Sequence, residues 1–148
     1  YAGCTYELLR EVDTMLMLKA NPEMRITNVF AVPAVLQFML MVPDVDKVDF
    51  SSLYTICYGA SPISVEVLAG SIKTFGSKFI QLYGMTETAG AVTYLPAEDH
   101  DISGTKLIAS AGRAVTRSPC EIRDAHGRAV PTGGQGGIWI QARACLKG

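Results

Sequence analysis

Short runs of apolar and β-branched residues alternate with stretches of helical spacing over the first two-thirds of the chain. The β-rich runs predict strands, at residues 5–9, 25–32, 53–58 and 78–83. The stretches between them predict helices at residues 14–20, 34–41 and 63–75. Residues 34–41 are good helix formers, and residues 63–75 repeat apolar residues at helical spacing. A repeated strand–helix–strand order implies right-handed crossovers and a parallel sheet. The pattern therefore predicts an α/β fold, with a parallel βαβ sheet layer of the flavodoxin-like kind covered by helices.

Prolines, serines and glycines mark where these helices begin and end. Pro33 suits the first turn of its helix, where a missing N–H leaves no bond unmade. Ser61 can cap the helix that runs to residue 75, with Pro62 in its first turn, and Gly76 then stops that helix. In parallel sheets, ligands bind beyond the carboxyl ends of the strands. Two loops follow such ends and are candidate binding loops, at residues 59–62 and 84–90.

The character of the chain changes after about residue 95. Residues 98–106 are polar and rich in turn formers, and two short strand candidates follow at 120–124 and 137–141. Turns separate these two strands, which predicts a small antiparallel β portion. We therefore expect two units: an α/β subdomain over residues 1–112, and the start of a β-rich subdomain over residues 113–148.

Composition narrows the class of protein. Of the 148 residues, 49% are apolar and 18% are charged, as in globular rather than disordered chains. The net charge of −1 provides no basic face for a nucleic acid. The longest apolar stretch, residues 29–42, is interrupted by Pro33 and Gln37, so we expect no membrane span. The four cysteines form no Cys-x-x-Cys pair, which disfavours zinc and favours reduced thiols in a cytoplasmic protein.

Two short motifs resemble catalytic loops, but their surroundings disfavour that chemistry. The glycine-rich run at 133–137 lacks the lysine and the following helix of a phosphate-binding loop, and predicts a hairpin turn instead. Ser61 lies between a strand and a helix, as a hydrolase nucleophile does, but Ile63 stands where that motif needs a small residue. We interpret Ser61 as part of a backbone surface for a flat ligand, or as a helix cap.

The strongest chemical signal is the sequence Tyr-Gly-Met-Thr-Glu-Thr at residues 83–88. It places two hydroxyls and a carboxylate directly after the end of a strand. Hydroxyls and exposed backbone N–H groups can bind phosphate oxygens, and a carboxylate beside them can hold Mg²⁺. A second interpretation stays open, in which Thr86 or Thr88 caps a turn and Glu87 is only solvated.

This hexapeptide, about twenty residues past the Gly-Ala-Ser-Pro turn at 59–62, resembles the adenylate-forming superfamily of acyl-CoA synthetases, luciferases and nonribosomal adenylation domains. Further similarity covers nearly the whole chain, at residues 26–34, 110–114, 121–124, 131–133 and 137–140. Within the superfamily, the run Val-Pro-Ala-Val-Leu-Gln-Phe at 32–38 is most similar to bacterial medium- or long-chain fatty-acyl-CoA ligases.

The resemblance implies a two-step ligase reaction. A fatty-acid carboxylate attacks the α-phosphate of ATP and releases pyrophosphate, and the thiol of coenzyme A then attacks the acyl-adenylate. Mg²⁺ offsets the charge on the phosphates. Carried over by position, Thr86 contacts the α-phosphate and Glu87 binds Mg²⁺. The resemblance also implies residues that line the adenine and acyl end, namely Gly59, Ala60 and Ser61, and residues of a nucleotide-facing strand end, namely Gln81, Leu82, Tyr83 and Gly84. Val32, Pro33 and Leu36 are either a wall of the acyl pocket or core.

Several family features are not in these residues. The phosphate loop with its lysine would precede residue 1, and the ribose-binding Gly-Asp and the C-terminal domain would follow residue 148. Tyr58 stands where the family commonly has glycine, and so does Leu82. We therefore expect a central piece of a longer synthetase, inactive without the remainder of its parent chain. Two alternatives stay open: a stand-alone nucleotide-binding or interaction module without catalysis, and a purely structural α/β domain.

Overall fold

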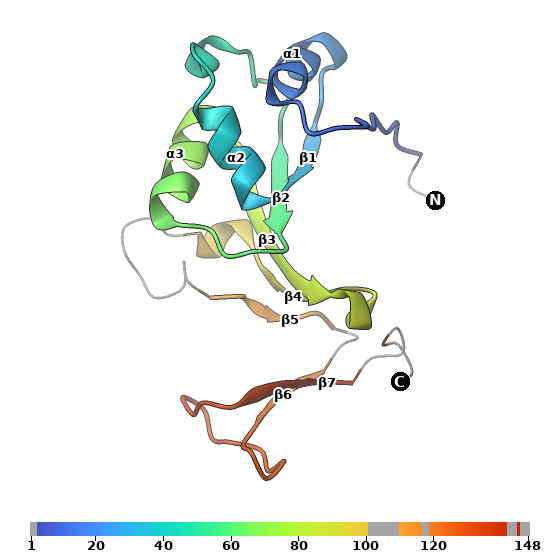
Figure 1. Cartoon of the computed structure of the whole chain (residues 1–148), viewed down its shortest axis with the longest axis vertical. Coiled ribbons are helices and arrows are strands. Elements are labelled where there is room, and N and C mark those ends of the chain that lie inside the picture. The colour runs from blue at the N-terminus through green and yellow to red at the C-terminus, as the bar shows by residue number, and fades with distance from the viewer. Residues whose placement is uncertain (1–2, 101–109, 117–118, 142–144, 146–148) are drawn as a thin grey trace.

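A computed structural model describes residues 3–100, 110–116, 119–141 and 145. The helices are α1 (Thr14–Met24), α2 (Pro33–Leu40) and α3 (Val65–Phe75), with short 3₁₀ turns η1 (Val45–Lys47), η2 (Thr86–Thr88) and η3 (Ala97–Asp99). The strands are β1 (Asn28–Ala31), β2 (Thr55–Gly59), β3 (Lys78–Met85), β4 (Gly90–Leu95), β5 (Arg113–Ala114), β6 (Cys120–Arg123) and β7 (Gly137–Ile140). Figure 1 shows β1 to β5 following one another from top to bottom, with the β6–β7 pair below them.

The predicted α/β class is confirmed. Strands β1 to β5 form one sheet in chain order, in which β1, β2 and β3 are parallel and β4 and β5 are antiparallel. Strands β6 and β7 form a separate antiparallel pair, as the turns between them predict. Within the described ranges, no helix has the length and apolar character that crossing a bilayer requires.

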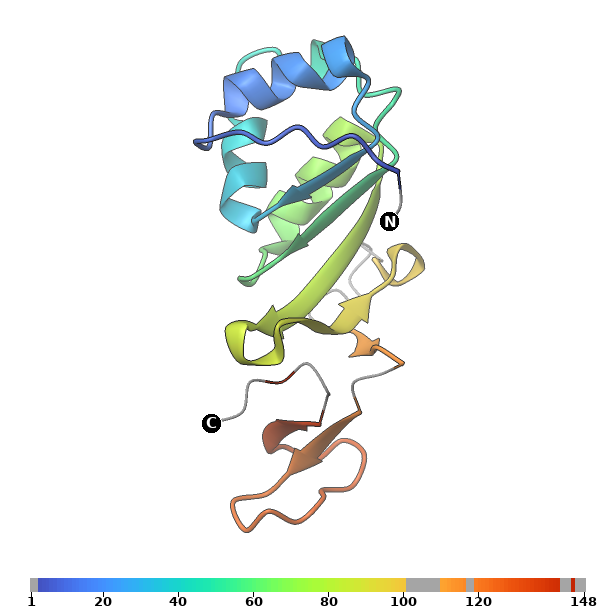
Figure 2. The same ribbon diagram turned by 90° about the vertical axis from the view of Figure 1, so that its right-hand side faces the viewer.

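Helices α2 and α3 cover one face of the parallel strands, and they lie behind β1 to β3 in Figure 2. The hydrophobic core lies between these helices and the sheet. Its most deeply buried members come from α2, β2, α3 and β3: Leu36, Ile56, Tyr58, Leu68, Phe75 and Phe79. Among the described residues, none of the β6–β7 pair belongs to this core.

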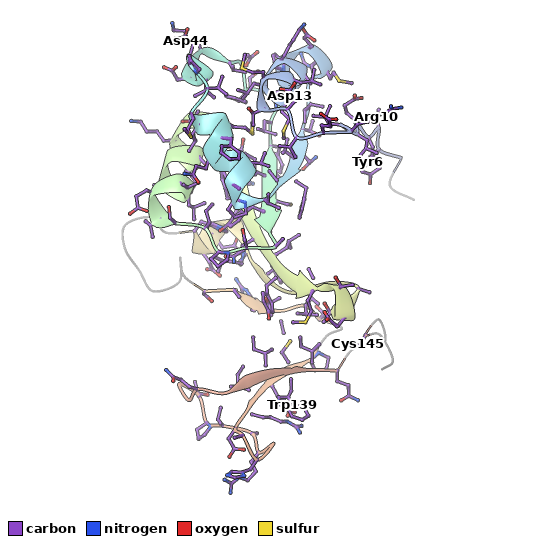
Figure 3. All side chains as sticks on the ribbon, viewed as in Figure 1. Tyr6, Arg10, Asp13, Asp44, Trp139 and Cys145 are labelled. Atoms are coloured by element: carbon purple, nitrogen blue, oxygen red, sulfur yellow. The ribbon has the colours of Figure 1, made fainter. Side chains whose placement is uncertain are left out.

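The strand predicted at residues 5–9 is wrong. This segment forms no strand, and the side chains of Tyr6 and Leu8 are 85% and 88% exposed. Figure 3 shows Tyr6 and Arg10 on the extension that precedes α1. A strand needs a partner for its backbone groups, and no strand of the described residues pairs with this segment.

Two helix boundaries differ from the prediction for local reasons. The first helix continues past residue 20 to Met24, and Arg25 ends it in the left-handed conformation, with φ of 50°. That termination shortens the predicted strand 25–32 to β1. The third helix begins at Val65 because its cap is Ser64, whose Oγ accepts a hydrogen bond from the Val67 N–H at 3.2 Å. The prediction that Ser61 caps this helix is therefore wrong.

The pattern also missed part of the main sheet. β3 is two residues longer than the predicted strand 78–83, and it turns through η2 into β4, which the sequence pattern did not indicate. β5 then pairs with β4 through Thr93–Ala114 and Tyr94–Arg113. The polar segment predicted at 98–106 lies mostly outside the described residues; its first residues belong to η3.

Candidate functional site

The candidate site lies where β2 and β3 end. These strands are parallel neighbours, and Gly59 at the end of β2 pairs with Leu82 of β3. The loop after β2 therefore lies beside the last residues of β3, although some twenty residues separate them in the sequence. A cavity of about 400 Å³ lies between the two segments, and its lining is Ala60, Ser61, Pro62, Ile63, Gln81, Leu82, Tyr83, Gly84 and Ala111. Most of the sequence-predicted binding residues thus line one cavity.

Gly59 does not line this cavity, but it makes the cavity possible. A Cβ atom at Gly59 would collide with the backbone carbonyl oxygen of Leu82. Only glycine lets the two strand ends approach this closely. The next residue, Ala60, has a φ of 68°, in the left-handed region that a side chain makes unfavourable. Such a conformation persists where the surrounding structure enforces it, and it turns the chain sharply into the cavity wall.

Gly84 has the same role on β3. Its Cβ would collide with the carbonyl oxygen of Gly90 on β4. The pairing of β3 with β4 shifts register between Tyr83 and Gly84, which is a β-bulge. Bulges are common next to active sites, because they redirect the chain at the end of a strand. Here the bulge precedes the turn that carries Thr86 and Glu87.

Thr88 holds this turn together. Its side chain is buried at 6% exposure, and its Oγ1 accepts a hydrogen bond from the Met85 N–H at 3.0 Å. The same hydroxyl lies 2.8 Å from the Met85 carbonyl oxygen and 2.7 Å from that of Gly90, to which it can donate. Of the two threonines that the sequence offers as a cap, the structure uses Thr88.

Thr86 and Glu87 lie on the outside of the same turn. Both are exposed, and neither side chain makes a hydrogen bond or ion pair within the described part of the chain. The structure does not place them among the residues that line the cavity. They lie instead just beyond it, on the turn that follows Gly84 and Met85, where a ligand extending out of the cavity would meet a hydroxyl and a carboxylate.

A second cavity, of about 330 Å³, adjoins the first. The two share Ala60, Leu82 and Gly84, and the second adds Phe30, Met85, Gly90 and Ala91. Its lining is apolar, unlike the first, which includes Ser61, Gln81 and Tyr83. The added residues were not among the predicted site residues. The exposed Phe30 at the end of β1 was a signal that could have indicated them, whereas Gly90 and Ala91 belong to the strand that the pattern missed.

Val32, Pro33 and Leu36 do not line either cavity. Pro33 and Leu36 are buried, Leu36 with no exposed surface, and Val32 packs against the core. Of the two interpretations that the sequence leaves open for these residues, the structure supports the core.

A half-buried polar cluster adjoins the first cavity through Gln81. The Tyr58 hydroxyl lies 3.0 Å from Nε2 of His100 and 3.4 Å from Oε1 of Gln81, and His100 Nδ1 lies 2.8 Å from the Pro96 carbonyl oxygen. Burial raises the pKa of Tyr58 to about 12. Burial also lowers the pKa of His100 below its ordinary value of 6.5, partly offset by the bond to Pro96 and by the charges of Asp99 and Glu98. Sequence reasoning noted Tyr58 as unusual but did not connect it with His100.

No group of three or more metal-ligating side chains occurs in the ranges that the structure describes. Glu87 therefore offers a single carboxylate. This fits Mg²⁺, which keeps several waters and takes one or two protein carboxylates together with substrate phosphates. It does not fit a structural metal enclosed by protein ligands.

The family model and the most similar relatives indicate the same family of proteins. A family model described as "AMP-binding enzyme" matches residues 1–148. The medium/long-chain-fatty-acid–CoA ligase FadD8 of Mycobacterium tuberculosis is 38% identical over 133 residues, which are 90% of this chain and 23% of that protein. The fatty acid–[acyl-carrier-protein] ligase ScoC of Streptomyces coeruleorubidus is 32% identical over 143 residues, which are 97% of this chain and 27% of that protein. The chain thus spans about a quarter of the length of these relatives.

Two solved structures are similar to this chain in fold. The amide bond synthetase McbA of Marinactinospora thermotolerans superposes with a TM-score of 0.85 at 30% identity, over 95% of this chain and 28% of that one. The N-terminal domain of FACL13 from Mycobacterium tuberculosis superposes with a TM-score of 0.79 at 27% identity, over 91% of this chain and 32% of that one.

Proposed function

Because this chain belongs to the AMP-binding enzyme family, we propose that it is the central part of an ATP-dependent, AMP-forming fatty-acyl-CoA synthetase. The parent enzyme joins a fatty acid to AMP with release of pyrophosphate, and then transfers the acyl group to coenzyme A. The observation that carries the proposal is the meeting of two separate segments at one cavity, with Thr86 and Glu87 just beyond it and without a partner among the described residues.

The first cavity suits the nucleotide. Its lining combines Ala60 and Ser61 with Gln81 and Tyr83. A flat base needs apolar faces and a few directed polar groups, which this wall provides, while Gly59 keeps the two segments close. Gln81, Leu82, Tyr83 and Gly84 are the nucleotide-facing end of β3 in this proposal.

The turn after β3 suits the phosphates. The exposed hydroxyl of Thr86 can donate to the α-phosphate, and the carboxylate of Glu87 can hold Mg²⁺. When bound, the ion offsets the negative charge that the reacting phosphates carry. Thr88 keeps this turn rigid, so that Thr86 and Glu87 are held in position before the ligand arrives.

The second cavity suits the reacting end of the fatty acid. Its walls are apolar, and it meets the first cavity at Ala60, Leu82 and Gly84. A carboxylate held at this junction would lie between the acyl cavity and the phosphates. Phe30, Met85 and Ala91 then contact the hydrocarbon chain and exclude water from it.

Catalysis needs the rest of the parent. Positioning of the triphosphate supplies much of the rate in this chemistry, and the chain spans only 23% of the relative with which it shares 38% identity. We therefore propose that residues 1–148 alone are inactive. In the parent, residues 1–112 and 113–148 belong to an α/β and a β-rich subdomain. ATP and coenzyme A are cytoplasmic metabolites, and we place the reaction in the cytoplasm.

The test is ATP–pyrophosphate exchange by the full-length parent, driven by medium- and long-chain fatty acids. Glu87→Gln should lower the exchange rate about 100-fold, since it removes one charged group at the reacting phosphates. Thr86→Val should lower it too, and Thr86→Ser should restore most of it. Glu23→Gln is the matched control, because this exposed glutamate lies on α1, which Figure 1 shows at the opposite end of the strands.

The outcomes separate the possible functions. The parent could catalyse exchange and transfer the acyl group to an acyl-carrier protein but not to coenzyme A. The proposed first step would then stand, and the acceptor in the second step would be the carrier protein. ATP binding without exchange would favour a nucleotide-binding module. Equal exchange by wild type and Glu87→Gln would remove Glu87 from the site.

A further inference from the structure

The polar cluster that adjoins the first cavity contains two groups that the proposed reaction does not use, Tyr58 and His100. Tyr58 has no exposed surface, and its hydroxyl lies between His100 of the segment after η3 and Gln81 of β3. Only Gln81 of these three lines the cavity. The cluster therefore connects a histidine outside the cavity with a side chain inside it.

The hydrogen bonds of this cluster have one consistent direction. The Pro96 carbonyl oxygen can only accept, so Nδ1 of His100 must carry a proton at its distance of 2.8 Å. In a neutral imidazole, Nε2 then has a lone pair and accepts from the Tyr58 hydroxyl at 3.0 Å. The hydroxyl has one proton, and it goes to this shorter contact rather than to Gln81 at 3.4 Å.

The consequence reaches Gln81. Toward Gln81, the Tyr58 oxygen now presents only lone pairs, so the carboxamide must turn its NH₂ group to Tyr58. The structure places Oε1 as the atom 3.4 Å from the Tyr58 hydroxyl. The oxygen and nitrogen of a glutamine side chain are assigned from their hydrogen bonds, and this cluster selects the opposite orientation, with the NH₂ group facing Tyr58. The carboxamide oxygen is then left to accept a hydrogen bond from a ligand.

We propose that His100 is a positioning residue for the cavity: acting through the Tyr58 hydroxyl, it holds the Gln81 carboxamide with its oxygen free for a donor group of the bound ligand. Tyr58 has no exposed surface, and His100 supplies the partner that its buried hydroxyl needs. The nature of the ligand, a nucleotide, rests on the proposed function; the direction of the hydrogen bonds does not.

Acid should reverse the arrangement. The charged groups around His100 are Asp99 and Glu98 on η3 and Arg113 on β5. The Arg113 guanidinium lies 2.9 Å from the Asp99 carboxylate. Tyr58 of β2 contacts the imidazole ring through its hydroxyl, at Nε2. Burial outweighs the two carboxylates and keeps the imidazole neutral at pH 7. When Nε2 takes a proton, it becomes a donor, the Tyr58 proton turns toward Gln81, and the carboxamide must rotate. Ligand affinity should therefore fall as the pH drops below 6.5.

The first experiment does not depend on the proposed function. Nitrogen NMR of the histidine-labelled full-length protein should show His100 at neutral pH with its proton on Nδ1 and none on Nε2. Tyr58→Phe removes the hydrogen-bond donor to Nε2 and should shift the Nε2 resonance of the neutral ring, with the protein still folded. A proton on Nε2 at neutral pH, or an unchanged Nε2 resonance in Tyr58→Phe, would overturn the proposal.

The second experiment measures ATP affinity by calorimetry. His100→Leu and Tyr58→Phe should each weaken binding about tenfold. His100→Gln, which keeps an acceptor near the Nε2 position, should bind almost as wild type and lose the decline at acidic pH. In a Gln81→Ala background, His100→Leu should have no further effect.

If His100→Leu weakens ATP binding as much in the Gln81→Ala background as in the wild type, His100 acts on the fold and not through Gln81. That result would overturn the proposal. If the wild-type protein binds no ATP while the NMR result holds, the proposed nucleotide is wrong and the hydrogen-bond arrangement stands.

Discussion

The helix-covered sheet and the β6–β7 hairpin use similar residues in different ways. Ile56 in β2 is 1% exposed and Ile138 in β7 is 47% exposed. All of β2 except Cys57 is buried, whereas no described residue of β6 or β7 is. Figure 3 shows Trp139 projecting from the hairpin, and this side chain is 53% exposed. The first region is stabilised by burial, and the second by contacts between near neighbours.

Those near-neighbour contacts are polar. Arg123 pairs with Glu121 at 2.7 Å and lies 4.9 Å from the Trp139 ring centre, and Asp124 closes the turn by accepting from the backbone N–H groups of His126 and Arg128. A two-stranded hairpin of this kind is marginal by itself. The candidate site lies on the region that burial makes rigid, as expected for groups that must hold a fixed geometry.

The largest effect should come from a glycine in the covered sheet. Gly59→Ala forces a Cβ against the Leu82 backbone carbonyl, which neither strand can move aside, and should destabilise the fold by roughly 3 kcal/mol. Gly127→Ala is the matched hairpin change: Gly127 has a φ of 77° but open space around it, and the expected loss is about 1 kcal/mol. Chemical denaturation measures both. Equal losses would contradict the distinction between the regions.

Truncation of apolar residues should differ in the same way. Leu36→Ala leaves a cavity under α2 and should lower the free energy of unfolding by about 2–5 kcal/mol. Ile138→Ala removes a half-exposed side chain, and its effect should stay under about 1 kcal/mol. If the hairpin truncation were the more damaging of the two, Ile138 would be buried against a part of the parent that the described residues do not include.

The turn that carries Thr86 and Glu87 should be less sensitive than the core. Thr88→Val keeps the shape of the side chain but leaves the Met85 N–H without its bond to Oγ1, a loss of roughly 1–3 kcal/mol. Amide hydrogen exchange should show faster opening of residues 85–90 than of α3. Unchanged exchange at Met85 would mean that Thr88 does not hold the turn.

The smallest effect should be the response of the hairpin to acid. The backbone hydrogen bond from Arg128 is the main cause that lowers the pKa of Asp124 below its ordinary value of 3.8. Because the folded pKa is the lower one, the stabilisation is complete above pH 3.8 and is lost as the pH falls through the folded value. The NMR signal of the Asp124 side-chain carboxyl carbon should titrate below pH 3.8, and the signal of the Arg128 backbone amide should follow it. Titration of Asp124 above 3.8 would contradict this.

Local signals explain how much of the fold could be predicted. Pro33 and Gly76 set helix ends through their own backbone restrictions, and both predictions agree with the structure. Ser61 and Ser64 have the same side chain, and either could cap α3 as far as local sequence shows. The path of the loop after β2 places Ser61 at the cavity and Ser64 at the start of the helix. The extended run at residues 5–9 has strand-forming residues but no partner strand among the described residues.

For the site, the sequence was sufficient to identify the loops after β2 and β3, because parallel strands bring their carboxyl ends to one edge. The bond of Thr88 to Gly90 and the apolar cavity at Phe30 needed the pairing of β3 with β4. The partnership of Tyr58 with His100 joins residues 42 positions apart. Residue types and short spacings determine helix ends and turns, since those interactions span a few residues. Burial and hydrogen bonding between distant segments are set only when the sheet assembles, because a buried polar group takes whichever partner the fold brings within reach.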